Sequence, residues 1–224
     1  GGEQAVVLVH GIGVSSNYYM PLAEILARQY DVHVVDMPGY LDTPKPPKPL
    51  SPLEQSEILA GYLEQLGIYN AIIVGHSMGS QTATHLTANY PGYCKKLILI
   101  GPTVNKWERH VLLQAFRLFC DTLVEPLKVN ALILHDYLHM GMPAYLTTTG
   151  YMITDHIEDS LKNVSSPLCI IRGNRDWIAP QKWVEYLAKI ARNGQSHAIP
   201  RGPHNVQYPY AKEVAAVCSA FIAD

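Results

Sequence analysis

Two patterns of apolar residues alternate along this chain. Continuous apolar runs of four or five residues, typical of strands buried on both faces of a parallel sheet, occupy positions 5–9, 71–74, 97–100 and 168–171. A similar run at 32–35, interrupted only by His33, is read as another buried strand. A shorter segment, 196–199, is a sixth candidate strand. Between these runs, apolar residues recur at helical spacing, as in Ile58, Leu59, Tyr62, Leu63 and Leu66. The alternation predicts a three-layer α/β sandwich, with a mostly parallel sheet of about six strands between two layers of helices.

Capping residues mark where two of the helices should begin. Ser15-Ser16-Asn17 can cap a helix that continues to about Gln29. Ser51-Pro52-Leu53-Glu54 has the order of a capping box with proline at the first helical position, and Gly67 is suited to end the helix that follows.

The alternation of strand and helix stops between Thr103 and Val164. This segment holds helical patterns, one that includes Trp107, Val111, Phe116 and Phe119 and another over residues 131–138, but no convincing strand. We therefore expect a helical lid at 103–164, inserted into a core made of 1–102 and 165–224.

A proline-rich segment, 41–49, interrupts the pattern between the second strand and the second helix. Proline lacks a backbone N–H, so Pro44, Pro46, Pro47 and Pro49 fit neither a helix interior nor a sheet ladder. A docking motif in polyproline conformation is one interpretation. A stiff excursion of the surface is the one we favour.

Length, charge and cysteine content narrow the class of protein. A chain of 224 residues can form one sizeable domain, and its net charge of −2 without any basic run argues against nucleic-acid binding. No apolar window approaches the ~20 residues of a membrane span, and Gly1-Gly2-Glu3 resembles no signal peptide. Metal-ligand spacing, a phosphate-binding loop and any other cofactor motif are absent. Four scattered cysteines, without a Cys-x-x-Cys pair, favour free thiols and a cytoplasmic location.

The candidate chemistry centres on Gly75-His76-Ser77-Met78-Gly79, which follows an apolar strand and precedes a helix. In that context Gly-x-Ser-x-Gly indicates a nucleophile elbow, a sharp turn that exposes the serine. Four further motifs accompany it in order along the chain: His10-Gly11-Ile12-Gly13, Asp36-Met37-Pro38-Gly39, Gly173-Asn174-Arg175-Asp176 and Gly202-Pro203-His204. With these five motifs the chain resembles the lid-bearing α/β-hydrolases, which include esterases, lipases and carbon–carbon bond hydrolases.

The resemblance implies a catalytic triad of Ser77, Asp176 and His204. Serine needs a neighbouring base to accept its proton during attack, and an acid orients that base. His204 follows the last predicted strand and Asp176 the strand before it, so both should lie at the carboxyl edge of the sheet. The other histidines fit the role of base less well: His197 lies on a strand, His76 should point elsewhere around the elbow, and His10 should hold its loop in shape.

The other aspartates fit the role of orienting acid less well. Asp36 matches a structural position of the family, and Asp155 and Asp159 lie at the end of the lid.

An oxyanion hole should accompany the triad, because attack on a carbonyl places negative charge on oxygen. We expect the backbone N–H of Met78 and that of Ile12 to form it, with Gly13 as the alternative to Ile12. Two features depart from the family. The loop after Gly39 continues into Tyr40-Leu41-Asp42 and prolines, and the chain begins almost at the strand before the oxyanion loop.

The lid should provide the substrate pocket. Its aromatic residues and methionines could line an apolar pocket. We expect Tyr137, Met140, Tyr145 and Met152 to contact the substrate there. Further candidates are Phe116, Phe119, Met142 and Tyr151. We expect hydrolysis of a small or medium apolar carboxylic ester. Carbon–carbon bond, lactone or amide hydrolysis or acyl transfer by the same triad, and a non-catalytic ligand-binding protein, are the alternatives. The protein should be a monomer or a homodimer.

Overall fold

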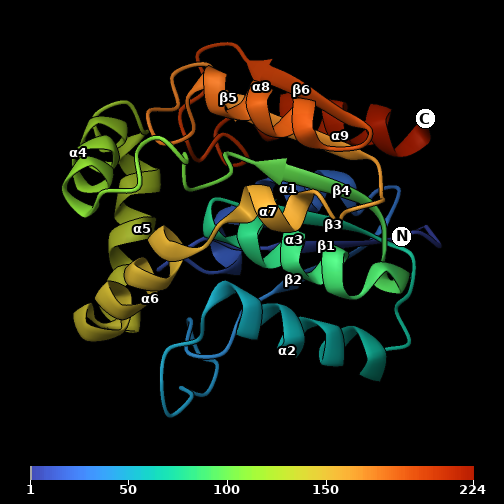
Figure 1. The fold of residues 1–224 in the computed structure, drawn as a ribbon, viewed down its shortest axis with the longest axis horizontal. Helices are drawn as coiled ribbons and strands as arrows, with labels where there is room; N and C mark the ends of the chain where they lie inside the picture. The colour runs from blue at the N-terminus through green and yellow to red at the C-terminus, as the bar shows by residue number, and fades with distance from the viewer. Residues whose placement is uncertain (1) are drawn as a thin grey trace.

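Six parallel strands form one sheet through the centre of the molecule (Figure 1). The computed structural model describes residues 2–224, so Gly1, the first residue of the expected core, lies outside the described residues. The strands are β1 (Ala5–Val9), β2 (Asp31–Val35), β3 (Ala71–His76), β4 (Cys94–Ile100), β5 (Leu168–Gly173) and β6 (Gly194–Ile199). Their spatial order, β2-β1-β3-β4-β5-β6, confirms the expected α/β sandwich.

Helices cover both faces of the sheet because successive side chains of each strand point to opposite sides. Val7 and Val9 of β1 belong to one buried cluster and Val6 and Leu8 to the other. The first cluster includes residues of α2 (Pro52–Gln65), α3 (Met78–Asn89), α7 (Ile157–Leu161) and α8 (Gln181–Ile190). The second includes η1 (Ser16–Tyr19), α1 (Met20–Leu26) and α9 (Ala211–Ala223), and a short 3₁₀ turn, η2 (Pro91–Tyr93), precedes β4.

Both predicted helix starts are present, although one helix is shorter than expected. Ser51 and Glu54 form the complete capping box of α2, with Pro52 at its start. Ser15 caps the 3₁₀ helix η1 by accepting the Asn17 N–H, and α1 then ends at Leu26 rather than near Gln29.

The strand β2 is less buried than its apolar sequence suggested. Its residues are partly exposed, whereas all those of β1 and β3 are buried. The reason is its position at one end of the strand order, where only β1 pairs with it. The run at 32–35 therefore identified the strand correctly but not its place in the sheet.

Between β4 and β5 the chain forms α4 (Val111–Thr122), α5 (Leu127–Met140), α6 (Met142–Thr154) and α7. We call residues 103–164 the insertion. Figure 1 shows α4, α5 and α6 gathered beyond the carboxyl ends of the strands. The expectation that Trp107 belongs to the first helix was wrong, because α4 begins four residues later and Trp107 packs against Trp183 and Tyr186 of α8.

The proline-rich segment contacts the insertion. Residues 41–49 contain neither helix nor strand. The Lys45 ammonium donates hydrogen bonds to the carbonyl oxygens of His139 and Met140, at 3.1 and 3.5 Å, where α5 ends. None of the helices within residues 2–224 combines the length and apolar character that crossing a membrane requires.

Candidate active site

The strand order places a crevice at the carboxyl ends of β1 and β3. The chain leaves β1 toward the face that carries α1 and leaves β3 toward the opposite face that carries α3. Such a reversal opens a crevice outside the sheet where ligands commonly bind. The loop at His10-Gly11-Ile12 and the turn at Ser77 meet there.

Ser77 occupies the sharp turn between β3 and α3. Its backbone has φ 53° and ψ −122°, a region that costs a residue with a side chain of order 1–3 kcal/mol. The flanking glycines are required by backbone contacts. A Cβ on Gly75 would lie 2.3 Å from the carbonyl oxygen of Gly79, and one on Gly79 would lie 2.4 Å from the carbonyl oxygen of Val9.

His204 and Asp176 are brought together from two different loops. The Nδ1 of His204 lies 3.0 Å from Oδ2 of Asp176, and both residues are buried. The other carboxylate oxygen of Asp176 accepts the N–H groups of Ile178 and Ala179, at 2.8 Å each. These bonds fix the carboxylate as an acceptor, so in the neutral imidazole of His204 the proton is on Nδ1 and Nε2 has a free lone pair.

His204 and Ser77 line the same cavity, but the Nε2 atom of His204 makes no hydrogen bond to the Ser77 hydroxyl. It is buried, and no hydrogen-bond partner for it exists among residues 2–224. Burial alone would lower the pKa of this imidazole, but the negative charges of Asp176, Asp121 and Glu125 together raise it to about 9. A ring nitrogen without a hydrogen-bond partner, beside a cavity lined mostly by apolar side chains, is suited to accept a proton from a group bound there.

Of the two expected oxyanion donors, Ile12 lines the same cavity. Met78 is not among the lining residues, but it is the first residue of α3 and directly follows Ser77, which lines the cavity. Neither N–H has a hydrogen-bond acceptor within the described part of the chain. An N–H in the first turn of a helix lacks an intrahelical partner and favours negative charge.

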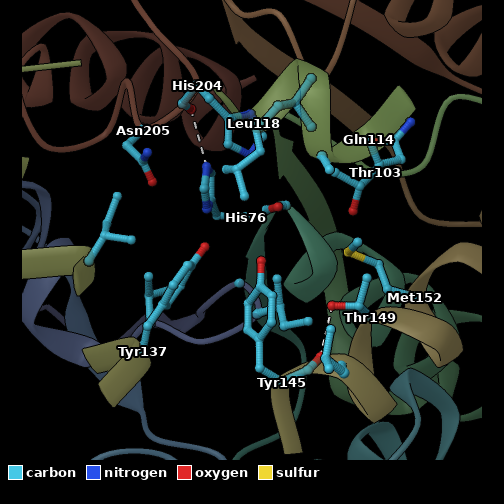
Figure 2. A pocket seen from close by; sticks show the side chains of 18 of the residues that line it. His76, Thr103, Gln114, Leu118, Tyr137, Tyr145, Thr149, Met152, His204 and Asn205 are labelled. Atoms are coloured by element: carbon cyan, nitrogen blue, oxygen red, sulfur yellow. Dashed lines mark hydrogen bonds between the residues drawn. The ribbon is translucent and has the colours of Figure 1, made fainter. Parts of the chain in front are cut away.

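A chain of hydrogen bonds behind the cavity connects its two loops. The Gly11 N–H donates to Tyr18 Oη at 2.9 Å, and the Tyr18 hydroxyl lies 2.9 Å from Nδ1 of His76. Nε2 of His76 lies 3.1 Å from the carbonyl oxygen of His204 (Figure 2). Because a carbonyl only accepts, His76 donates from Nε2 and accepts from Tyr18 at Nδ1. None of the sequence motifs includes Tyr18, which lies 58 residues before its partner His76.

His10 holds the loop after β1, as expected. Its Nδ1–H donates to the carbonyl oxygen of Gly11 at 2.8 Å, and its Nε2 accepts the Met37 N–H at 3.0 Å. Burial lowers the pKa of His10, so the ring stays neutral and keeps both bonds.

The other acidic candidates are engaged elsewhere. Asp36 accepts both the N–H and the hydroxyl of Ser16, at 2.7 Å each, which ties β2 to η1. Asp155 pairs with His85, and Asp159 pairs with Lys162. His197 lies exposed on β6 beside Gln195.

The cavity has a volume of about 200 Å³ and lies between the sheet and the insertion. Figure 2 shows Tyr137 and Tyr145 on one side of it, Leu118 and Gln114 on another, and His204 at its upper end. Three of the four selected lid residues, Tyr137, Tyr145 and Met152, line it. Met140 does not, and instead borders a smaller cavity against Lys45 and Pro46.

The first helix of the insertion presents a different face to the cavity than the sequence suggested. Val111, Gln114, Ala115 and Leu118 line the cavity, while Phe116 and Phe119 are 57% and 61% exposed. Met142 is exposed as well. No lysine, arginine, aspartate or glutamate is among the residues that line the cavity. No cluster of three or more metal-ligating side chains was found within residues 2–224.

Comparison with known proteins gives relatives over the whole chain. Residues 4–141 match the family model described as the alpha/beta hydrolase fold. A pimeloyl-[acyl-carrier protein] methyl ester esterase from Vibrio cholerae is 25% identical, over 99% of this chain and 94% of its own. A 2-hydroxy-6-oxononadienedioate/2-hydroxy-6-oxononatrienedioate hydrolase from Burkholderia vietnamiensis is 27% identical, over 99% of this chain and 88% of its own.

Among solved structures, the bromoperoxidase from Bacillus anthracis superposes with a TM-score of 0.85 at 19% identity. The alignment covers 100% of this chain and 93% of that protein. At this identity the match speaks for the fold alone, and it agrees with the sheet order and the helical layers described above.

Proposed function

Since the chain belongs to the α/β-hydrolase fold family, we propose that it is a serine hydrolase that cleaves a small or medium apolar carboxylic ester. Ser77 is the nucleophile, His204 the base and Asp176 the orienting acid. One observation carries the proposal: the His204 ring is held through Nδ1 by a buried carboxylate, its buried Nε2 has no partner, and His204 and Ser77 line the same cavity.

Acylation follows from this geometry. The Ser77 hydroxyl oxygen attacks the ester carbonyl carbon while Nε2 of His204 takes the hydroxyl proton. The negative charge that develops on the carbonyl oxygen is stabilised by the N–H groups of Ile12 and Met78. The intermediate collapses, the bond to the alcohol oxygen breaks, and the departing alcohol takes the proton from Nε2.

Deacylation repeats the same steps with water. Nε2 accepts a proton from a water molecule as its oxygen attacks the acyl carbon. The acid then leaves, and the proton returns to the Ser77 oxygen. Asp176 accepts the hydrogen bond from Nδ1 of His204 and stabilises the imidazolium of each step.

The insertion acts as a lid over this site. Its helices provide Tyr137, Tyr145 and Met152, and also Val111 and Leu118, to an uncharged pocket for the acyl or alcohol group. The substrate is a small molecule, and no cofactor enters the reaction. Three buried free cysteines fit a reducing compartment such as the cytoplasm.

Ser77→Ala tests the proposal. We expect kcat on a panel of p-nitrophenyl esters, graded by acyl length, to fall by at least about 10³-fold, and labelling by a fluorophosphonate to disappear. Ser165→Ala, at an exposed serine, is the matched control and should leave both unchanged. An unlabelled but fully active Ser77→Ala protein would exclude the acyl-enzyme.

The same triad could act on another carbonyl bond. The relative from Burkholderia vietnamiensis carries the name of a dienedioate hydrolase, and a dioate is a dianion. No lysine or arginine lines the cavity to bind it, which favours a neutral ester. A vinylogous diketone assayed beside the ester panel separates the two reactions, and turnover of the diketone without any ester would replace the esterase proposal.

A non-catalytic ligand-binding role is the remaining alternative. It would require that the panel show no turnover and that the fluorophosphonate leave Ser77 unlabelled, while a neutral ester still raises the melting temperature. All three candidate triad residues are present, which favours catalysis over this role.

A further inference from the structure

Two acidic side chains of the insertion are buried against the loop that carries His204. Asp121 lies at the end of α4 and Glu125 in the turn that follows, and their exposed fractions are 2% and 7%. Aspartate and glutamate are almost never fully buried unless they are paired. Neither takes part in an ion pair with lysine or arginine within the described residues.

Their partners are backbone groups of the histidine loop. Oδ1 of Asp121 accepts the His204 N–H at 3.1 Å. Oε1 of Glu125 accepts both the N–H and the side-chain amide of Asn205, at 2.7 Å each. One turn of the insertion thus holds two successive N–H groups of the loop, and the Asp121 carbonyl oxygen fixes that turn by accepting the N–H groups of Val124 and Glu125.

The charges of this cluster act on the His204 imidazole. Four groups from three segments face it: Asp176 from the loop after β5, Asp121 and Glu125 from the insertion, and His76 from the end of β3. Burial raises the pKa of Asp121 to about 8, an effect that the charges of Asp176 and Glu125 reinforce, and burial raises the pKa of Glu125 as well. Each carboxylate that is ionised favours the protonated form of His204.

We propose that Asp121 and Glu125 are positioning residues, which fix the His204 backbone so that the imidazole is aligned between Asp176 and Ser77 when the insertion is docked. This inference rests on the proposed function, because it takes His204 to be the base. Neither residue touches the substrate, since neither lines the cavity. Their effect passes through the backbone N–H bonds and through the charge they place near the ring.

Two substitutions at Asp121 separate the effect of the backbone hydrogen bond from the effect of the charge. Asp121→Ala removes the acceptor, so the loop loses the hydrogen bond to the His204 N–H. We expect kcat to fall by roughly 10- to 100-fold, as a displacement of about 1 Å can cause, with KM changed far less. Asp121→Asn retains an oxygen acceptor without the charge. It should keep most of kcat and shift the acid limb of kcat/KM to lower pH, because a charge that favours the imidazolium is gone.

Thr122→Ala is the matched control, at an exposed residue on the same turn that contacts neither His204 nor the cavity. It should match the wild type in kcat and in pH profile. If Asp121→Ala retains the kcat of the control, or if Asp121→Asn loses as much kcat as Asp121→Ala, the proposal is overturned. If Asp121→Ala does not fold, Asp121→Asn is sufficient as a test: an acid limb of kcat/KM at the same pH as in the wild type overturns the proposal.

A titration of the His204 ring by NMR keeps this test independent of the proposed function. The measurement needs no substrate and reports the pKa of the imidazole in the wild type and in Asp121→Asn. A lower pKa in the variant supports the inference even if no ester is turned over, an outcome that counts against the esterase alone. An unchanged pKa overturns the inference even if the wild type is an active esterase.

Discussion

Tyr18 joins the oxyanion loop to the loop of His204 through a single hydroxyl group. Its oxygen accepts the Gly11 N–H and its proton is donated to His76, which in turn donates to the His204 carbonyl oxygen. Tyr18 is fully buried, so water cannot replace the hydroxyl once it is removed.

Tyr18→Phe should therefore cost both stability and activity. It leaves two buried polar groups without partners, a penalty of about 1–3 kcal/mol for each, and it frees the Gly11 backbone. We expect a lower unfolding free energy in urea and a lower kcat on the ester panel. Tyr19→Phe is the control, because that buried hydroxyl donates only to the Val9 carbonyl oxygen. Equal losses of kcat in the two variants would refute a role for the network in catalysis.

The pH dependence of kcat/KM should report the surroundings of His204. The imidazole must be neutral to accept the Ser77 proton, so activity falls as the pH drops through its pKa. An unperturbed histidine would place this limb near 6.5, and the sequence alone gives no other expectation. The surrounding carboxylates raise the pKa of His204 to about 9. The acid limb should accordingly lie above pH 6.5 in a profile from pH 5 to 10, and a limb at or below 6.5 would contradict this.

The three triad candidates could be predicted because each lies within five residues of the end of a strand. The carboxyl ends of parallel strands meet at one edge, so Ser77, Asp176 and His204 were expected near each other from their order alone. Tyr18, Asp121 and Glu125 could not be found in this way. Their partners lie at least 58 residues away along the chain, and the contacts depend on how a helix and the insertion pack.

At the scale of single elements, α4 shows a limit of hydrophobic periodicity. Its polar residues Gln114, Arg117 and Asp121 recur at helical spacing and so share one side of the helix. Gln114 and Asp121 are its buried residues, whereas the apolar Leu112 is exposed. The usual rule, that the apolar side of a helix faces the core, is reversed here. We expected Phe116 and Phe119 in the pocket, and the structure turns them outward while Val111 and Leu118 face it.

The packing of α3 on the end of β1 gives a prediction at the same scale. A Cβ on Gly79 would lie 2.4 Å from the carbonyl oxygens of both Val9 and His10, and neither backbone atom can move without disturbing the sheet. Gly79→Ala should therefore lower the melting temperature strongly or prevent folding. Gly61→Ala, within α2 and with nothing near its would-be Cβ, should instead raise stability by up to about 1 kcal/mol. A Gly79→Ala protein as stable as the wild type would contradict this packing.

At the scale of the whole molecule, the cavity is the space left between the sheet and the insertion, and it holds no charged side chain of Lys, Arg, Asp or Glu. Moving a carboxylate from water into such a site costs several kcal/mol. We expect kcat/KM for a p-nitrophenyl hemisuccinate to be at least about 10²-fold below that for p-nitrophenyl butyrate. Comparable values for the two esters would show that the anion is bound by groups outside the cavity.

The architecture of the sheet followed from the alternation of apolar runs and helical patterns, since each strand needs a helix to return the chain to the same edge. What the alternation could not provide was the order of the strands in space. The apolar sequence of β2 resembles that of a central strand, yet only β1 pairs with it.

The contacts of the insertion limit how segments can be exchanged between this protein and its relatives. Residues 103–164 are tied to the rest of the chain by Lys45, by Ser15 through Asp136, and by the loop of His204 and Asn205. A chimera that exchanges only the segment between β4 and β5 would inherit a new pocket and sever all three connections. To transplant a specificity, the donor's equivalents of Ser15, Lys45 and the 204–205 loop should be grafted together with its helices.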